Sequence, residues 1–286
     1  MARTSVVRRF RSTDLEGALA ANDAVGWTGR RVLFDYYSAR DDCALFVAEI
    51  DGEIVGTGGA TIFSGAPPTG WVHGIVVRPG QQRSGLGRRL TEAAVAWLHA
   101  RSAEAVLLLA TEAGRPVYER LGFAAGDRYG SFAWPPTAPD AVSSGAVSPG
   151  TGVATRAILA EDLPAIYALD HTATGEDRRG FIDVLASAGW VAACGADVVG
   201  FHLACPWGGG PIIARDADAG LALLRLAAAV RRAPRSLGLP ESNKAAVEHL
   251  NKLGIAADRY VTRMWLGAPP PWRADMIFGV FNFAVA

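Results

Sequence analysis

The stretch VRPGQQRSGLGRRL, from Val77 to Leu90, lies between an apolar run and an amphipathic pattern. The run before it, GWVHGIVV, predicts a strand, and the apolar residues that follow recur with helical spacing. A glycine-rich turn between a strand and a helix leaves several backbone N–H groups without partners at the helix N-terminus, where the helix dipole favours negative charge. The pattern therefore predicts a strand–loop–helix unit that binds a phosphate group through its main chain.

Two common phosphate-binding patterns do not fit this loop. A P-loop requires a lysine and a hydroxyl residue directly after its second glycine, but Leu86 and Gly87 follow Gly85. A dinucleotide-binding fingerprint requires a third glycine, and Gly87 is followed by Arg-Arg-Leu. Neither an ATPase-type loop nor a Rossmann domain is indicated.

The loop instead resembles the Gln/Arg-x-x-Gly-x-Gly/Ala motif of the GCN5-related N-acetyltransferases (GNAT), with QRSGLG at positions 82–87. The strand GWVHGIVV before it, the run VLLLA at 106–110 and the sequence VYERLGF at 117–123 follow the element order of that family. The resemblance implies an α/β fold with a mixed sheet. Each domain would have a mostly antiparallel sheet with one splayed parallel strand pair, flanked by helices.

The second half of the chain repeats this order of elements in a blurred form. Residues 135–152 are rich in Pro, Ser, Gly and Ala without periodicity, which indicates a linker. The ending YERLGF of the first half has a counterpart, LNKLGI, in the second. We expect a catalytic domain over residues 1–134, the linker over 135–152, and a degenerate GNAT-like domain over 153–286, as in a bacterial two-domain subgroup.

The second half lacks the residues that the first half would use for chemistry. Its loop reads RDADAGLALL, with two acidic residues, Asp216 and Asp218, and Leu250 stands where the first half has Tyr118. Acidic side chains repel a pyrophosphate. The sequence therefore predicts one acetyl-CoA site per chain, in the N-terminal half.

The resemblance implies acetyl-CoA as co-substrate, without a metal. The main-chain amides from Arg83 to Arg88 would face the CoA pyrophosphate, and the pantetheine arm would pair with the end of the preceding strand. The arginines of the loop would either contact phosphates or remain solvated surface charges. Many family members have glycine where Arg83 stands, which leaves its role open. The expected CoA-binding residues are Ile75, Val76, Val77, Gln82, Arg83, Ser84, Gly85, Leu86, Gly87 and Arg88.

The resemblance also implies two catalytic side chains. Tyr118 precedes Gly122 by the spacing at which the family has the tyrosine that protonates the departing thiolate; the alternative is a core aromatic residue. Strand alternation places His73 on one face with Trp71, Ile75 and Val77, where it would act as a base or orient a water molecule. The alternatives are a structural histidine and another base acting through water. The family's usual oxyanion donor is a backbone N–H near Val77.

The acceptor would be an amine of a small molecule or peptide. Trp71, Asp177 and Arg178 are candidate substrate residues, the last two in the stretch DHTATGEDRRGF, which could bind a cationic or zwitterionic acceptor. The alternative for that stretch is an ordinary surface loop. An alternative function for the whole chain is a non-catalytic acyl-CoA-binding regulatory protein. The sequence leaves association into a homodimer open.

Composition excludes several other classes. The 28 basic and 28 acidic side chains give no net charge, which argues against nucleic acid as a partner. The three cysteines form no CxxC pair, so neither a zinc site nor a disulfide framework is indicated. No apolar run has the length of a membrane span, and the N-terminus has no signal-peptide pattern, so we expect a cytoplasmic protein without membrane contacts.

Overall fold

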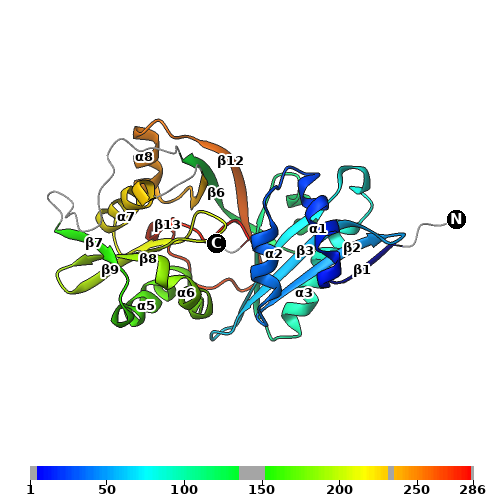
Figure 1. Ribbon diagram of the computed structural model, residues 1–286, viewed down its shortest axis with the longest axis horizontal. Coiled ribbons are helices and arrows are strands. Elements are labelled where there is room, and N and C mark those ends of the chain that lie inside the picture. The colour runs from blue at the N-terminus through cyan, green and yellow to red at the C-terminus, as the bar shows by residue number, and fades with distance from the viewer. Residues whose placement is uncertain (1–4, 135–151, 231–234, 285–286) are drawn as a thin grey trace. The chain divides into compact units, whose positions relative to one another are not determined.

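The computed structural model describes residues 5–134, 152–230 and 235–284 of the 286-residue chain (Figure 1). The contacts divide the chain into two compact units. Unit 1 comprises Met1–Ala125 and Met264–Pro269, and unit 2 comprises Gly126–Arg263 and Pro270–Ala284. Apart from Gly152, the expected linker lies outside the described residues. No helix among the described residues has the length and apolar character needed to cross a membrane.

Unit 1 is built on a mixed sheet. Its strand order is β1 (Ser5–Arg9), β2 (Cys43–Ile50), β3 (Glu53–Phe63), β4 (Thr69–Val77) and β5 (Ala105–Ala110). The pairs from β1 to β4 are antiparallel, and β4 and β5 are parallel. This sheet confirms the predicted mixed α/β class. An Asp-Gly turn joins β2 and β3, with positive φ at both Asp51 and Gly52.

Helices cover both faces of this sheet. The helices are α1 (Leu15–Asp23), α2 (Arg31–Ser38), α3 (Leu86–His99) and the short α4 (Arg115–Arg120). Gly17 of α1 lies against Ile54, whereas the next residue, Val55, joins the hydrophobic core with Leu90 of α3. Farther along β3, Thr57 contacts Asn22 of α1, whereas a Cβ at the next residue, Gly58, would lie 3.5 Å from Leu90 of α3. Because successive strand residues point to opposite faces, α1 and α3 lie on opposite sides of the sheet.

Each half of the sequence contributes a strand to the unit of the other half. In unit 1, β5 is followed by the end of β12 (Ala257–Gly267), whose Met264 is fully buried in the core around Leu90. In unit 2, β6 (Ala124–Trp134) from the first half pairs antiparallel with β11 (Arg235–Pro240). The units therefore differ from the expected domain limits, which ended the first domain at Trp134 and kept residues 264–269 in the second.

Unit 2 contains a further five-stranded sheet. Its order is β13 (Ile277–Gly279), β10 (Ile212–Ala214), β9 (Asp197–Leu203), β8 (Gly189–Cys194) and β7 (Val153–Ala157), with antiparallel pairs throughout. The helices are α5 (Leu163–Thr174), α6 (Arg179–Leu185), α7 (Ala217–Val230) and α8 (Lys244–Lys252). The parallel pair expected in each domain is present in unit 1. In unit 2 the strands at the corresponding places in the element order, β10 and β11, are not neighbours. β10 lies between β9 and β13, and β11 lies beside β6.

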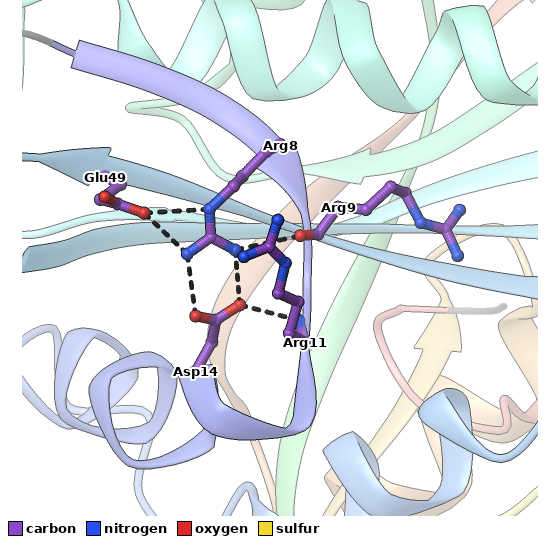
Figure 2. Close-up of polar contacts among 5 residues, drawn as sticks. All are labelled: Arg8, Arg9, Arg11, Asp14 and Glu49. Atoms are coloured by element: carbon purple, nitrogen blue, oxygen red, sulfur yellow. Dashed lines mark hydrogen bonds and ion pairs between the residues drawn. The ribbon is translucent and has the colours of Figure 1, made fainter. Parts of the chain in front are cut away.

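An ion pair shows that the two halves share one design. In unit 1, Arg8 of β1 contacts Asp14 through both guanidinium Nη atoms, at 2.7 and 2.9 Å, and also contacts Glu49 (Figure 2). In unit 2, Arg156 of β7 contacts Asp162 in the same way, at 2.6 and 2.8 Å. Both pairs are six residues apart in sequence. This repeated Arg–Asp spacing is a further sequence signal of duplication.

Candidate functional site

The strands β4 and β5 separate partway along their length. Their parallel pairing runs from Thr69 with Ala105 to Trp71 with Leu107. Beyond that point β4 continues to Val77, paired with β3 on its other edge. The predicted splayed pair is thus present in unit 1, and from His73 onward the β5-facing edge of β4 has no partner among the strands that the structure describes.

A β-bulge interrupts β4 where the strands separate. Thr57 pairs with Val76 and Gly59 pairs with His73, so β4 has one residue more than β3 between these pairs. Gly74 lies in the bulge with φ of +61°, and its carbonyl oxygen accepts a hydrogen bond from Thr57 Oγ1 at 3.1 Å. In a trans peptide the C=O and N–H point in opposite directions. The Ile75 N–H therefore points away from the Thr57 hydroxyl of β3.

The bulge overturns the expectation that His73 shares a face with Ile75 and Val77. Ile75 and Val77 pack against the core cluster that contains Leu90 of α3. The ring of His73 instead lies on Tyr37 of α2, with 4.5 Å between ring centroids. In a regular strand, every second side chain points to the same face of the sheet. The extra residue in the bulge shifts this pattern by one, so that His73 and Ile75 point to opposite faces.

The loop after β4 presents consecutive unpaired amides. Arg83 and Gly85 have φ of +61° and +84°, and α3 begins at Leu86. None of the backbone N–H groups from Arg83 to Arg88 donates a hydrogen bond to another described residue; the first paired amide is that of Arg89, which donates to Gly85 O at 3.1 Å. Successive N–H groups in such a turn form a concave anion site at the helix N-terminus.

The side chains of the loop are mostly engaged with the protein. Arg78 pairs with Glu53, Arg88 pairs with Glu92 at 2.8 Å, and Arg89 donates to Ser5 Oγ at 2.8 Å. The Gln82 amide donates to Val77 O at 3.0 Å. Exposed ion pairs contribute only about 0.2–1 kcal/mol, so these arginines can exchange partners when an anion binds. Arg83 has no side-chain partner within the described part of the chain.

Tyr118 lies on α4 in the core of unit 1. Its ring is 8% exposed and meets Phe123 edge-on, with 6.0 Å between centroids. Burial raises the pKa of its hydroxyl to about 12, so it is protonated at neutral pH. The hydroxyl makes no hydrogen bond with any described residue. Tyr118 thus combines the packing of a core aromatic with a proton that it can donate.

His73 is enclosed by protein groups. It is 6% exposed, its Nε2 lies 3.2 Å from Thr61 Oγ1, and it makes a backbone hydrogen bond with Ala60. Burial lowers its pKa to about 3. An imidazole with that pKa is a weak base, and these contacts fit the structural alternative that the sequence left open.

The three candidate substrate residues lie in different environments. Trp71, in unit 1, is fully buried. Arg178, in unit 2, is 2% exposed and forms a buried ion pair with Asp170, with Nη2 2.6 Å from Oδ1. Asp177 is half-buried and contacts Arg179 at 3.1 Å. The surface loop expected around Arg178 is thus partly interior, because Asp170 on the preceding helix neutralises the guanidinium.

In the corresponding loop of unit 2, an aspartate side chain lies at the start of the helix. The Asp216 carboxylate accepts a hydrogen bond from the Ala219 N–H at 3.0 Å, at the start of α7. Leu250, at the position of Tyr118, is fully buried in an apolar cluster. The described residues include no group of three or more His, Cys, Asp or Glu side chains that could hold a metal ion.

Comparisons with known proteins agree with this architecture. A model of the Acetyltransferase (GNAT) family matches residues 18–123, and a second model, an Acetyltransferase (GNAT) domain, matches residues 166–279. YitH of Bacillus subtilis, named as an uncharacterized N-acetyltransferase, is 26% identical over 220 residues, 73% of each chain. A mycothiol acetyltransferase of Thermomonospora curvata is 38% identical over 86 residues, 29% of this chain and 28% of that protein.

Solved structures show the same fold. A crystal structure of a Pyrococcus horikoshii protein assigned as an acetyltransferase has a TM-score of 0.79 at 20% identity, covering 99% of this chain and 96% of that one. A GCN5-related N-acetyltransferase of Sphaerobacter thermophilus has a TM-score of 0.59 at 17% identity, covering 94% of this chain and 97% of that one. At these identities the similarity concerns the fold.

Proposed function

Because the chain belongs to the GNAT superfamily and carries two GNAT domains in tandem, we propose that it transfers an acetyl group from acetyl-CoA directly to an amine of a small molecule or peptide. The observation that supports this most is the row of unpaired N–H groups from Arg83 to Arg88 at the start of α3. A diphosphate provides the acceptor oxygens that such a row lacks.

The residues of unit 1 fit the remaining parts of the coenzyme. The unpaired edge of β4 from Ile75 to Val77 offers main-chain groups to an extended pantetheine arm, in the manner of an added strand. Acetyl-CoA supplies the activated acyl group as a thioester. We propose one such site per chain, because in unit 2 Asp216 already occupies the start of the matching helix.

Two groups carry the chemistry in this proposal. The Ile75 N–H, which points away from the Thr57 hydroxyl, donates to the oxyanion that develops on the acyl carbonyl. The Tyr118 hydroxyl gives its proton to the departing thiolate. For the amine, we propose that its proton leaves through water and that His73 holds β4 to β3 through Thr61, rather than acting as the base.

A turnover screen tests this function. Thiol release from acetyl-CoA is followed in the presence of a panel of amines and peptide N-termini, and products are identified by mass spectrometry. We expect saturable, amine-dependent release with a mass gain of one acetyl group. Thermal stabilisation by acetyl-CoA with no turnover across the panel would instead favour the non-catalytic acyl-CoA-binding protein.

A further inference from the structure

We propose that Thr57 and Asn22 are positioning residues for the acyl transfer, because together they hold the peptide between Gly74 and Ile75 in its functional orientation. The inference rests on the proposed function, in which the Ile75 N–H stabilises the oxyanion. Neither residue lies near the glycine-rich loop in sequence, and neither carries a charge. What connects them to the site is a chain of hydrogen bonds inside unit 1.

The chain starts on α1 and ends at the bulge. Asn22 is 3% exposed, and its side-chain Nδ2 donates to Ala18 O at 2.9 Å and to Thr57 Oγ1 at 3.1 Å. Thr57 is 2% exposed, and its Oγ1 donates to Gly74 O at 3.1 Å. Hydrogen bonds thus connect groups of α1, β3 and β4, and the two side chains that make them are buried.

Donor counting allows only one direction for this line. A carbonyl oxygen can only accept, so the single hydroxyl hydrogen of Thr57 lies toward Gly74. The Thr57 oxygen must then accept from Asn22, whose NH₂ group has two hydrogens and uses both. The orientation of the Asn22 amide is therefore determined, and every hydrogen in the line has an acceptor.

The bulge peptide needs such a contact. The ladder pairs on either side, Thr57 with Val76 and Gly59 with His73, leave Gly74 and Ile75 without register partners on β3. Gly74 has no side chain, and no heavy atom lies within 4 Å of where its Cβ would be. The Thr57 hydrogen bond opposes a rotation of this peptide, because a rotated peptide would turn the Ile75 N–H toward the Thr57 hydroxyl in place of the Gly74 oxygen.

The same hydrogen bond also strengthens the donor. Hydrogen bonds in a chain polarise one another, so a proton held at Gly74 O increases the positive charge on the Ile75 N–H of that peptide. Removing an oxyanion donor costs about 10²- to 10³-fold in kcat. Thr57 positions the oxyanion donor and is not itself the donor. We therefore expect removal of the Thr57 hydroxyl to lower kcat by roughly 10- to 100-fold, which is less than the loss of the donor would cost.

Three variants of the full-length chain test the proposal. Thr57→Val keeps the shape of the side chain and removes the hydroxyl, whereas Thr57→Ser keeps the hydroxyl. Asn22→Asp keeps the size of the side chain but replaces a donor with an acceptor, which withdraws the Thr57 proton from Gly74. We expect Thr57→Val and Asn22→Asp to lose kcat with unchanged affinity for coenzyme A, and Thr57→Ser to retain most of the kcat.

A matched control and a second readout separate positioning from stability. Thr155 of β7 is also a buried strand threonine, and its hydroxyl has no hydrogen-bond partner among the described residues, so Thr155→Val should leave kcat unchanged. In the protein without coenzyme, the NMR resonance of the Ile75 amide should move in Thr57→Val and Asn22→Asp and stay in place in Thr155→Val.

Two results would overturn the inference. The first is a Thr57→Val variant with wild-type kcat and an unmoved Ile75 resonance. The second is a loss of kcat and coenzyme affinity together that Thr57→Ser does not restore, since that pattern indicates a general structural role. A wild-type chain that binds no coenzyme or shows no turnover would refute the proposed function itself, and this inference with it.

Discussion

Replacing Tyr118 with Phe removes one oxygen atom and isolates the proposed acid. The ring would keep its edge-on contact with Phe123, at 6.0 Å between centroids, and its place beside Gly114. The hydroxyl makes no hydrogen bond with a described residue, so its removal leaves no protein donor or acceptor unsatisfied. We therefore expect the free energy of unfolding to change by less than about 1 kcal/mol.

The pKa of Tyr118 limits the size of the catalytic effect. A phenol with a pKa of about 12 is a weaker acid than an ordinary thiol with a pKa of about 8.5, so complete proton transfer is uphill by roughly 5 kcal/mol. The proton therefore moves only as the C–S bond breaks. General acids contribute about 10²- to 10⁴-fold, and we expect Tyr118→Phe to lower kcat by about 10²- to 10³-fold, the lower part of that range.

Steady-state kinetics and calorimetry provide the assay. Thiol release gives kcat, and titration with coenzyme A gives the affinity, which should be the same in both proteins. Because Tyr118 is protonated at any pH below about 12, this group should cause no fall in wild-type kcat between about pH 7 and 10. A Phe variant with full kcat, or one that loses coenzyme binding as strongly as turnover, would refute the acid role.

Two further predictions concern stability. The folded pKa of His73, about 3, lies below the ordinary value of 6.5, so the unfolded chain binds a proton that the folded chain does not as pH falls. Between pH 7 and pH 5, His73 should lower the free energy of unfolding by on the order of 2 kcal/mol. In urea titrations, the His73→Gln variant should show a correspondingly smaller decrease over this pH interval. The same pH dependence in the variant and the wild type would contradict the prediction. Met264 is fully buried in the core of unit 1, so Met264→Ala should cost about 2–5 kcal/mol in chemical denaturation and lower the affinity for coenzyme A. A cost below about 1 kcal/mol would show that unit 1 does not depend on this strand.

The sequence was informative where a local pattern determines local structure. The glycines of QRSGLG, between an apolar strand and an amphipathic helix, predicted the turn before Leu86. The similar order of elements in the two halves predicted the tandem arrangement, which both family models confirm. Neither prediction depends on which strands lie side by side in the sheet.

The sequence was uninformative where distant residues determine the structure. The bulge at Gly74 adds one residue to β4, so His73 lies on the face of the sheet that Tyr37 covers. The prediction that His73 shares a face with Ile75 was therefore wrong. Thr57 and Asn22 are 35 residues apart and have no motif to connect them. An apolar strand pattern such as that of β12 shows that a strand forms, but it does not show which strand will lie beside it. The exchange of β6 and β12 therefore became visible only in the structure.

In the proposed function, main-chain amides at the start of α3 bind the diphosphate of coenzyme A. Gly85 has φ of +84° with open space around it, whereas Gly80 of the same loop has open space without positive φ. The left-handed conformation costs a residue with a side chain about 1–2 kcal/mol, so in Gly85→Ala the free loop relaxes out of the binding conformation. Returning to that conformation on binding lowers the affinity by about 5- to 30-fold. Gly80→Ala is therefore the matched control for Gly85→Ala.

Calorimetric titration of coenzyme A into the full-length protein and these two variants measures this binding. We predict one coenzyme per chain, a loss of affinity of about 5- to 30-fold in Gly85→Ala and near wild-type affinity in Gly80→Ala. A wild-type protein that binds no coenzyme, a stoichiometry of two, or equal affinities in the two glycine variants would contradict it.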